Sequence, residues 1–174
     1  KKIKDVLIGF NYIECNSYNL ISEDVLNKMN FKKEKIKVSN PVNAEYNTLR
    51  NWIIPSLMKI LSENKHNEYP QKIFEIGTIF EKEESESIGL LSCHTNANFT
   101  ELKQIIDYLF NALNLKYNME EFEHSSFISG RTGKIICNGK IMGFIGEINP
   151  EAIDNFNIEM PIAGLEINLS ELFK

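Results

Sequence analysis

The chain has 174 residues, enough for one domain that buries roughly two-thirds of the surface its unfolded form would expose. It contains no apolar run near the ~20 residues that a membrane span requires and no signal-peptide pattern. Its net charge of −5 and pI near 5.3 argue against a stand-alone nucleic-acid binder, because phosphate neutralisation supplies most non-specific affinity for nucleic acids.

The first quarter of the chain predicts short elements. A weak helical pattern of apolar residues covers Ile3 to Phe10, and β-branched and aromatic residues predict a strand over residues 10–21. Ser22 is a favourable N-cap for a short helix that ends at Met29. Alternation of apolar and charged residues over 36–38 predicts an edge strand, which the following Asn-Pro pair stops.

A helix and a β-hairpin follow. Pro55 suits the first position of a helix, where its missing N–H costs nothing, and the apolar stripe predicts that this helix ends near Asn67. Residues 72–80 predict a strand. The polar run Glu81–Glu86 predicts a hairpin loop, and Ile88–Thr95 predicts the returning strand.

The second half carries the clearest signals. Apolar residues of one face recur at helical spacing over Asn98–Leu115, and Asn98 and Glu101 have the spacing of a capping box. Asn138-Gly139 favours a two-residue hairpin turn. Further patterns predict a short helix over 150–156 and a last strand over 162–169. The mixture indicates an α+β fold, an antiparallel sheet flanked by helices, without the glycine-rich motifs of nucleotide-binding α/β domains.

The three cysteines, Cys15, Cys93 and Cys137, are widely separated and odd in number. They form neither a C-x-x-C pair nor a Cys/His cluster, so the sequence argues against a zinc site and against a disulfide framework. We therefore expect small buried thiols in a reducing cytoplasm. The three histidines have no spacing typical of a metal site or a triad, and we expect them to be structural or exposed.

The sequence contains only two arginines, Arg50 and Arg131. For Arg50 we favour an ion pair with a carboxylate such as Glu75, which would fix the loop before the proline-led helix, over a contact with a substrate. For Arg131 two interpretations are equally open, a contact with a partner subunit and a hydrogen bond to a backbone carbonyl.

Five stretches of the chain, in this order, resemble a known family: GFNYIECNSYNLIS, NPVNAEYNTLRNWIIPSLMKILSENKH, QKIFEIGTIF, NFTELKQIIDYLFNAL and GRTGKIICNGKIMGFIGEINPEAIDNF. Together they resemble the core of class II aminoacyl-tRNA synthetases and, within that class, the non-catalytic module of phenylalanyl-tRNA synthetase β subunits of archaeal or eukaryotic type. The resemblance implies a single class II-like domain over residues 1–174. Because the chain begins at Lys1 without an initiator methionine, we expect this domain to be cut from a longer polypeptide.

The resemblance also implies the loss of synthetase chemistry. In catalytic members of the class, an arginine after the strand that matches KIFEIGTIF binds the ATP α-phosphate, and Glu81 stands at that place here. The stretch PIAGLEINLSEL resembles a motif with a second arginine; Glu166 matches its acidic position, and Ile167 replaces the arginine. We therefore expect no amino-acid activation and no cofactor in this chain, with ATP and Mg²⁺ used elsewhere in the full enzyme.

The partner that the resemblance implies is the catalytic α subunit of phenylalanyl-tRNA synthetase, and the role is structural support for charging tRNA with phenylalanine. The candidate contact residues are three aromatic side chains and one arginine: Phe10, Tyr12, Trp52 and Arg131. We expect weak or indirect tRNA binding, no membrane contact, and a possible homodimer when the α subunit is absent. The alternative is a stand-alone synthetase paralogue that acts as a regulatory or amino-acid-sensing subunit.

Overall fold

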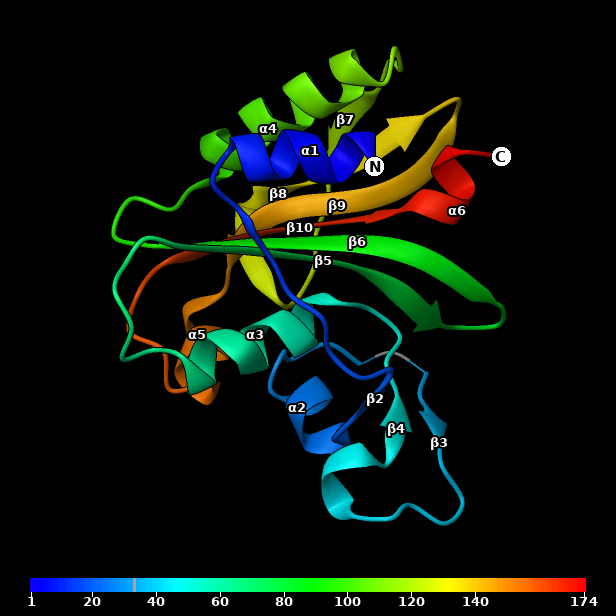
Figure 1. The fold of residues 1–174 in the computed structure, drawn as a ribbon, viewed down its shortest axis with the longest axis vertical. Helices are drawn as coiled ribbons and strands as arrows, with labels where there is room; N and C mark the ends of the chain where they lie inside the picture. The colour runs from blue at the N-terminus through cyan, green and yellow to red at the C-terminus, as the bar shows by residue number, and fades with distance from the viewer. Residues whose placement is uncertain (33) are drawn as a thin grey trace.

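The computed structural model describes residues 1–32 and 34–174 of the chain (Figure 1). The elements in chain order are α1 (Lys2–Gly9), β1 (Ile13–Glu14), β2 (Leu20–Ile21), α2 (Glu23–Asn27), β3 (Ile36–Lys37), a 3-10 turn (Ala44–Tyr46), β4 (Thr48–Leu49), α3 (Ile54–Glu63), β5 (Gln71–Phe80), β6 (Glu84–Cys93), α4 (Phe99–Ala112), β7 (Asn118–Glu121), β8 (Phe127–Cys137), β9 (Lys140–Ile148), α5 (Pro150–Asn155), β10 (Ile162–Asn168) and α6 (Leu169–Leu172).

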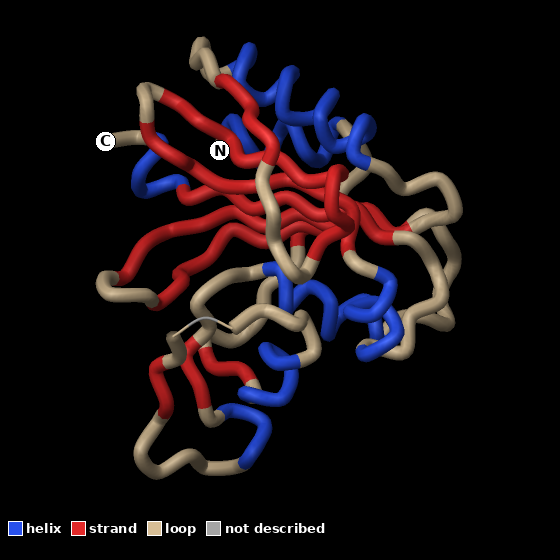
Figure 2. The backbone as a smooth tube through the Cα atoms, turned by 180° about the vertical axis from the view of Figure 1, so that it is seen from behind, coloured by secondary structure: helices blue, strands red, loops and turns tan. Residues whose placement is uncertain are grey.

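A seven-stranded sheet forms the centre of the molecule, in the order β1-β5-β6-β10-β9-β8-β7. Its neighbouring strands are antiparallel, except that β1 runs parallel to β5. The last strand, β10, therefore lies between β6 and β9 in the middle of the sheet. A second sheet of three very short strands, β2-β4-β3, belongs to a small lobe beside α2 (Figures 1 and 2). The predicted α+β class with an antiparallel sheet and flanking helices is confirmed.

Helices cover both faces of the large sheet. In Figure 1, α1 and α4 lie above the sheet, and α3, α5 and α2 lie below it. Alternate side chains of each central strand point into two separate cores: Phe74 and Leu90 into the core with α1 and α4, and Ile73 and Leu91 into the core with α3 and α5. Burial on both faces explains why the second half of β6 is apolar without alternation.

The structure confirms two predicted helix caps and the predicted hairpin turn. The Ser22 hydroxyl accepts from the N–H of Asp24 at 3.1 Å, and the Asn98 side chain accepts from the N–H of Glu101 at 3.0 Å. Only this half of the predicted capping box forms, because the Glu101 carboxylate pairs with other groups. Asn138 and Gly139 have φ values of 51° and 75°, as a type I′ turn requires.

Three predicted elements differ from the structure. The hairpin loop predicted over Glu81–Glu86 is shorter, because Glu84 to Glu86 already belong to β6 and pair with β5. Helix α3 ends at Glu63 rather than near Asn67, because the following residues are polar and exposed and offer no apolar side chain to the core. The strand predicted over residues 10–21 is two short strands. Between them the chain leaves the large sheet for the small lobe, and this crossing brings Ser17 to the Glu75 carboxylate, 2.6 Å away.

Candidate functional site on the sheet face

Arg50 lies between β4 and α3 and is 1% exposed. Its guanidinium Nη1 is 2.6 Å from Glu75 Oε1, and the same nitrogen donates to the Ser17 hydroxyl at 2.8 Å. Its Nε donates to the carbonyl of Thr78 at 2.8 Å. The predicted ion pair with Glu75 is thereby confirmed, and it is closed to solvent on both sides.

The backbone around Arg50 holds this arrangement in place. The Arg50 N–H donates to Asn19 O at 3.0 Å, and the Phe80 N–H donates to Arg50 O at 2.9 Å. Gly77 on β5 leaves the space that the guanidinium occupies, since a Cβ at this position would collide with Nη2 of Arg50. A buried ion pair of this kind is costly to break, because removal of one partner leaves an uncompensated charge.

Glu166 on β10 caps α3 from a distant part of the sequence. The helix has no side-chain cap of its own at Ile53. Instead the Glu166 carboxylate, 4% exposed, accepts from the N–H of Ile53 at 2.9 and 3.0 Å and from that of Ile54 at 3.1 Å. It also accepts from the Ser87 hydroxyl at 3.1 Å. A carboxylate at a helix N-terminus satisfies free N–H groups and interacts favourably with the helix dipole.

The two carboxylates lie in one row across the sheet. Glu75 on β5 and Glu166 on β10 are both register partners of Gly89 on β6. A Cβ at Gly89 would lie 2.8 Å from Cγ2 of Ile53, so the glycine makes room for that side chain between the carboxylates. The loop of residues 50–54 therefore fills the middle of this sheet face, which we call the strap face.

Glu81 and Ile167, the two residues predicted to replace phosphate-binding arginines, lie in different places. Glu81 is exposed just after β5 and lines a cavity of about 1000 Å³ beside α6. Ile167 is completely buried in the core with α1 and α4. Because side chains alternate along a strand, position 167 lies on the opposite sheet face from Glu166. An arginine there would point into the core, which corrects the expectation that Ile167 marks a lost phosphate contact.

Two of the predicted contact residues lie in the interior. Tyr12 is 3% exposed and shares a 2.5 Å hydrogen bond with the Ser92 hydroxyl, and Trp52 is 4% exposed beside Phe31 and Phe144. Both are needed to fill this chain's own core, so neither is a surface anchor. Sequence cannot distinguish these roles, because a large aromatic side chain suits both a core and an interface.

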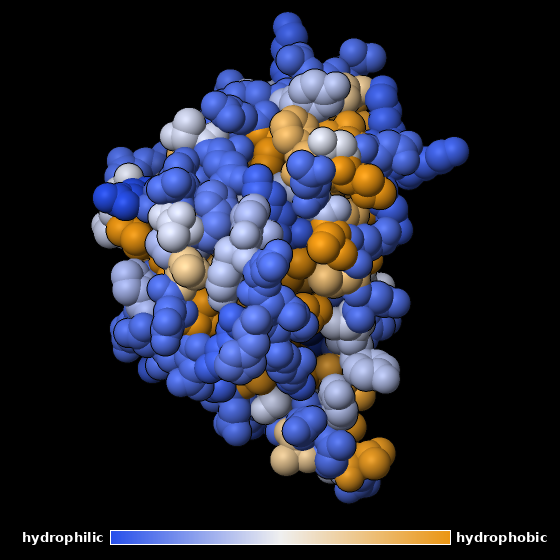
Figure 3. All heavy atoms as spheres, turned by 60° about the vertical axis from the view of Figure 1, so that its left-hand side comes forward, coloured by the Kyte–Doolittle hydropathy of each residue, from blue (hydrophilic) through white to orange (hydrophobic). Residues whose placement is uncertain are grey.

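Phe10 and Arg131 do reach the surface. Phe10 is half-buried and packs edge to face against Tyr108, with ring centroids 5.4 Å apart. Three strongly exposed apolar side chains belong to the adjoining elements α1, β1 and α4, and with Phe10 they form the set that we call the α1–β1 patch: Ile8, Ile13 and Tyr108. Ile13 pairs in register with Ile73 of the core with α3 and α5, so its side chain lies on the other side of the sheet edge from Tyr108. Figure 3 shows hydrophobic side chains gathered in spots among hydrophilic ones. Arg131 is bonded to Glu147 rather than to a backbone carbonyl, at 2.6 Å.

Two histidines and two cysteines are packed against other side chains of the fold. His94 Nε2 lies 2.9 Å from Glu101, and His124 is buried among aromatic rings. Burial raises the pKa of the Cys93 thiol to about 12, and burial together with the nearby Glu75 raises that of Cys15. Among residues 1–32 and 34–174, no three His, Cys, Asp or Glu side chains are grouped to hold a metal ion. In the same residues no helix is long and apolar enough to cross a membrane.

The architecture matches solved synthetases. A pyrrolysyl-tRNA synthetase from Desulfitobacterium hafniense superimposes with a TM-score of 0.81 over 98% of this chain and 65% of that chain, at 19% identity. At this identity the likeness shows the fold alone, which is that of class II aminoacyl-tRNA synthetases.

Sequence comparison then shows the family. Residues 1–169 match the model of the phenylalanyl-tRNA synthetase β chain CLM domain, and the chain belongs to this family. Phenylalanine–tRNA ligase β subunits from Pyrococcus abyssi and Pyrococcus horikoshii are each 42% identical over 99% of this chain, and that from Methanopyrus kandleri is 35% identical over 98%. The chain spans about a third of the length of these relatives, 33% for Pyrococcus abyssi.

Proposed function

We propose that the chain is a non-catalytic module of a phenylalanine–tRNA ligase β subunit, which packs against the catalytic α subunit and so supports the charging of tRNA with phenylalanine. The non-catalytic part of the proposal is supported by the internal contacts of the charged residues on the strap face. Arg50, with its ion pair to Glu75, and Glu166, with its contacts to α3, are engaged inside the chain. The polar groups that could meet a ligand on this face stabilise the fold instead.

An ATP–pyrophosphate exchange assay with phenylalanine and Mg²⁺ tests this part. We expect no exchange above background from the pure chain, because ATP and Mg²⁺ act elsewhere in the enzyme. We also expect no exchange from Glu81→Arg, since an arginine at the exposed hairpin does not displace the loop of residues 50–54. Phenylalanine-dependent exchange by the pure chain would overturn the proposal.

The α1–β1 patch is the surface that we propose for the α subunit, in place of Tyr12 and Trp52. Its apolar side chains are exposed around β1, the edge strand of the large sheet, and exposed apolar surface of this kind typically marks an interaction site. Ile13→Asp should abolish co-purification with the α subunit, whereas Ile141→Asp should not. These two isoleucines make a matched pair, because Ile13 is 68% exposed and Ile141 61% exposed, on different elements.

Sedimentation of the chain without the α subunit extends this test. If the patch also mediates self-association, the wild-type chain should form a homodimer and Ile13→Asp should be monomeric. A strict monomer that also fails to co-purify with the α subunit would contradict the proposal that this chain is a pairing module.

We propose that tRNA contacts this chain weakly and that the protein works in the reducing cytoplasm, where its unpaired cysteines stay reduced. With net charge −5 and two or three phosphate contacts, the slope of log affinity against log salt should be about −2. Filter binding measures it. A steep slope with tight binding at physiological salt would show that the basic surface is larger than proposed.

A further inference from the structure

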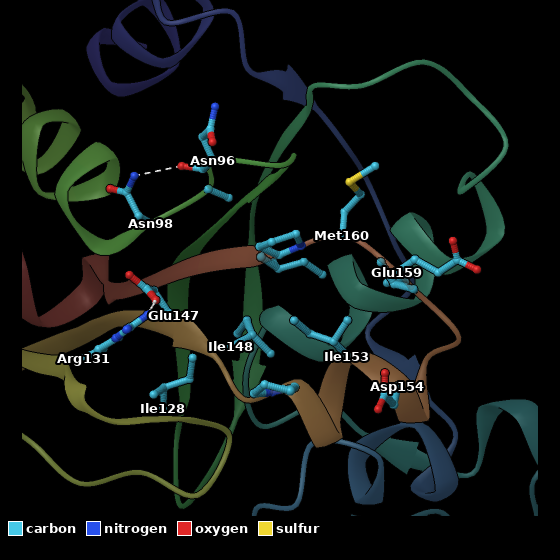
Figure 4. A pocket seen from close by; sticks show the side chains of 15 residues that line it. Asn96, Asn98, Ile128, Arg131, Glu147, Ile148, Ile153, Asp154, Glu159 and Met160 are labelled. Atoms are coloured by element: carbon cyan, nitrogen blue, oxygen red, sulfur yellow. Dashed lines mark hydrogen bonds and ion pairs between the residues drawn. The ribbon is translucent and has the colours of Figure 1, made fainter.

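A groove at one end of the large sheet is not used by the proposed pairing surface. Its volume is about 510 Å³, and its walls come from the β6–α4 connection, β8, the end of β9, α5 and the segment before β10. Figure 4 shows Arg131 and Glu147 at one end, Asp154 and Glu159 at the opposite end, and Ile148 and Ile153 between them. We call it the sheet-end groove.

A bulge in β8 directs Arg131 into this position. Phe127 pairs with Ile148 and Thr132 with Gly146, so residues 128–131 of β8 lie opposite the single residue Glu147 of β9. Gly130, at φ +74°, provides the left-handed backbone that the bulge requires. Bulges commonly redirect a side chain beside a functional site.

The charges at the Arg131 end are held firmly but remain accessible. Glu147 Oε2 accepts from Arg131 Nη1 at 2.6 Å, and Glu147 Oε1 accepts from the N–H of Phe99 at 3.1 Å. The Arg131 side chain is nevertheless 60% exposed, and that of Glu147 only 15%. Arg131 also borders a second cavity of about 540 Å³ along β7 and β8. A planar guanidinium held in this way can still bind an incoming carboxylate.

The opposite end has the reverse charge. Asp154 and Glu159 are exposed, and neither pairs with a cation among residues 1–32 and 34–174. The half-buried Ile128, beside Arg131, and Met160, beside Glu159, add apolar surface to the groove (Figure 4). A nucleic acid does not fit, because successive phosphates would meet the carboxylates of Asp154 and Glu159, and a single arginine cannot neutralise a phosphate backbone.

We propose that the sheet-end groove docks an extended peptide segment of a partner protein, with an acidic side chain at Arg131, small apolar side chains in the middle and a basic side chain at Asp154 and Glu159. We choose this occupant because its charges are complementary to those at the two ends of the groove. The small surface implies a weak, transient contact. The site is separate from the α1–β1 patch: Asn98, the N-cap of α4, lines the groove, and Tyr108 lies ten residues further along, about 15 Å away on a helix.

NMR amide mapping with short synthetic peptides tests this proposal. The probe is blocked at both ends and carries glutamate at one end, lysine at the other and valine, alanine and glycine between; both chain directions are used. We expect shifts confined to the groove amides, near Ile128, Arg131 and Asp154. The same peptide with glutamine at both ends should bind about two- to fivefold more weakly per lost ion pair.

A charge reversal makes the test specific. Arg131→Glu should lose the glutamate–lysine peptide and gain a peptide with lysine at both ends. Lys140→Glu is the matched control, because Lys140 is also exposed and ion-paired but lies at the other end of β9. Three results would overturn the proposal: equal binding of the glutamine peptide, peptide shifts that map to the α1–β1 patch, or groove shifts that depend on protein concentration without peptide, which would indicate a second copy.

Discussion

The two arginines of this chain lie in opposite environments. Arg50 on the strap face is 1% exposed and is bonded to Glu75, Ser17 and Thr78. The Arg131 side chain in the sheet-end groove is 60% exposed and, within residues 1–32 and 34–174, is bonded to Glu147 alone. Buried charges are retained only when they are fully paired, and exposed ones contribute little to stability. The comparison separates a cation required for folding from one that remains accessible to a partner.

The largest loss of stability is expected for Arg50→Met, which removes the buried cation of this comparison. It leaves the Glu75 carboxylate buried without its cation, so we expect a loss of about 3–5 kcal/mol in unfolding free energy. Urea denaturation followed by circular dichroism measures the loss. The double variant with Glu75→Gln should lose less than the two single variants combined, because the pair interacts directly. Strict additivity would show that the ion pair does not hold the loop.

Glu166→Gln should have the next largest effect. Glutamine keeps one acceptor oxygen but loses the charge and the second acceptor, so N–H groups at the start of α3 lose their partner, at about 1–3 kcal/mol. Hydrogen exchange of Ile53 and Ile54 should accelerate. Glu63→Gln is the control, because Glu63 lies on the same helix, is 61% exposed and makes only a long ion pair, with Lys59 at 3.8 Å. Equal destabilisation by both variants would contradict the capping role.

The carboxylate of Glu101 is half-buried, intermediate in exposure between the buried Arg50 pair and the exposed Arg131 pair, and the pH dependence of stability tests its role. Burial alone would raise the pKa of Glu101, but hydrogen bonds from Lys72 and His94 outweigh it and hold this pKa below 4.5. A lowered folded-state pKa means that the stabilisation is complete above about 4.5 and is lost as pH falls through the lower value. Glu101→Gln should therefore flatten the acid limb of the stability curve. Urea unfolding at a series of pH values from about 3 to about 7 measures this.

The smallest effect is expected for Arg131→Gln. Its partner Glu147 keeps the hydrogen bond from Phe99, and exposed substitutions usually change stability by less than about 0.5 kcal/mol. Thermal unfolding of the variant should be close to that of the wild type. A loss comparable to that of Arg50→Met would mean that Arg131 is a folding residue and would remove the contrast between the two sites.

Much of the fold could be predicted because its signals are local. Ser22, Asn98 and the Asn138-Gly139 pair act within a few residues of themselves, and each lies where the sequence placed it. The Arg50–Glu75 pair was foreseeable as well, since a buried arginine needs a carboxylate.

The rest depends on tertiary contacts. Glu166 caps a helix 113 residues earlier in the chain, and no local pattern marks that contact. Tyr12 and Trp52 were expected at an interface, and Ile167 was expected to mark a lost phosphate contact; all three are buried. The position of Ile167 depends on which sheet face its strand presents, and a strand that is covered on both faces gives no alternating pattern to show this. Tyr12 and Trp52 lie in connections outside the helices and strands, where no periodic pattern shows which side chain the core takes up.

The central place of β10 has a consequence for biosynthesis. During translation, β5, β6, β8 and β9 are made first, yet β6 and β9 cannot be joined until residues 162–168 are available to pair with both. Until then each has an open strand edge, the kind of surface that promotes intermolecular pairing. The cap on α3 arrives in the same step, because Glu166 belongs to this strand. Closure of the sheet and capping of α3 are therefore a single step, which waits for β10, in the folding of this domain.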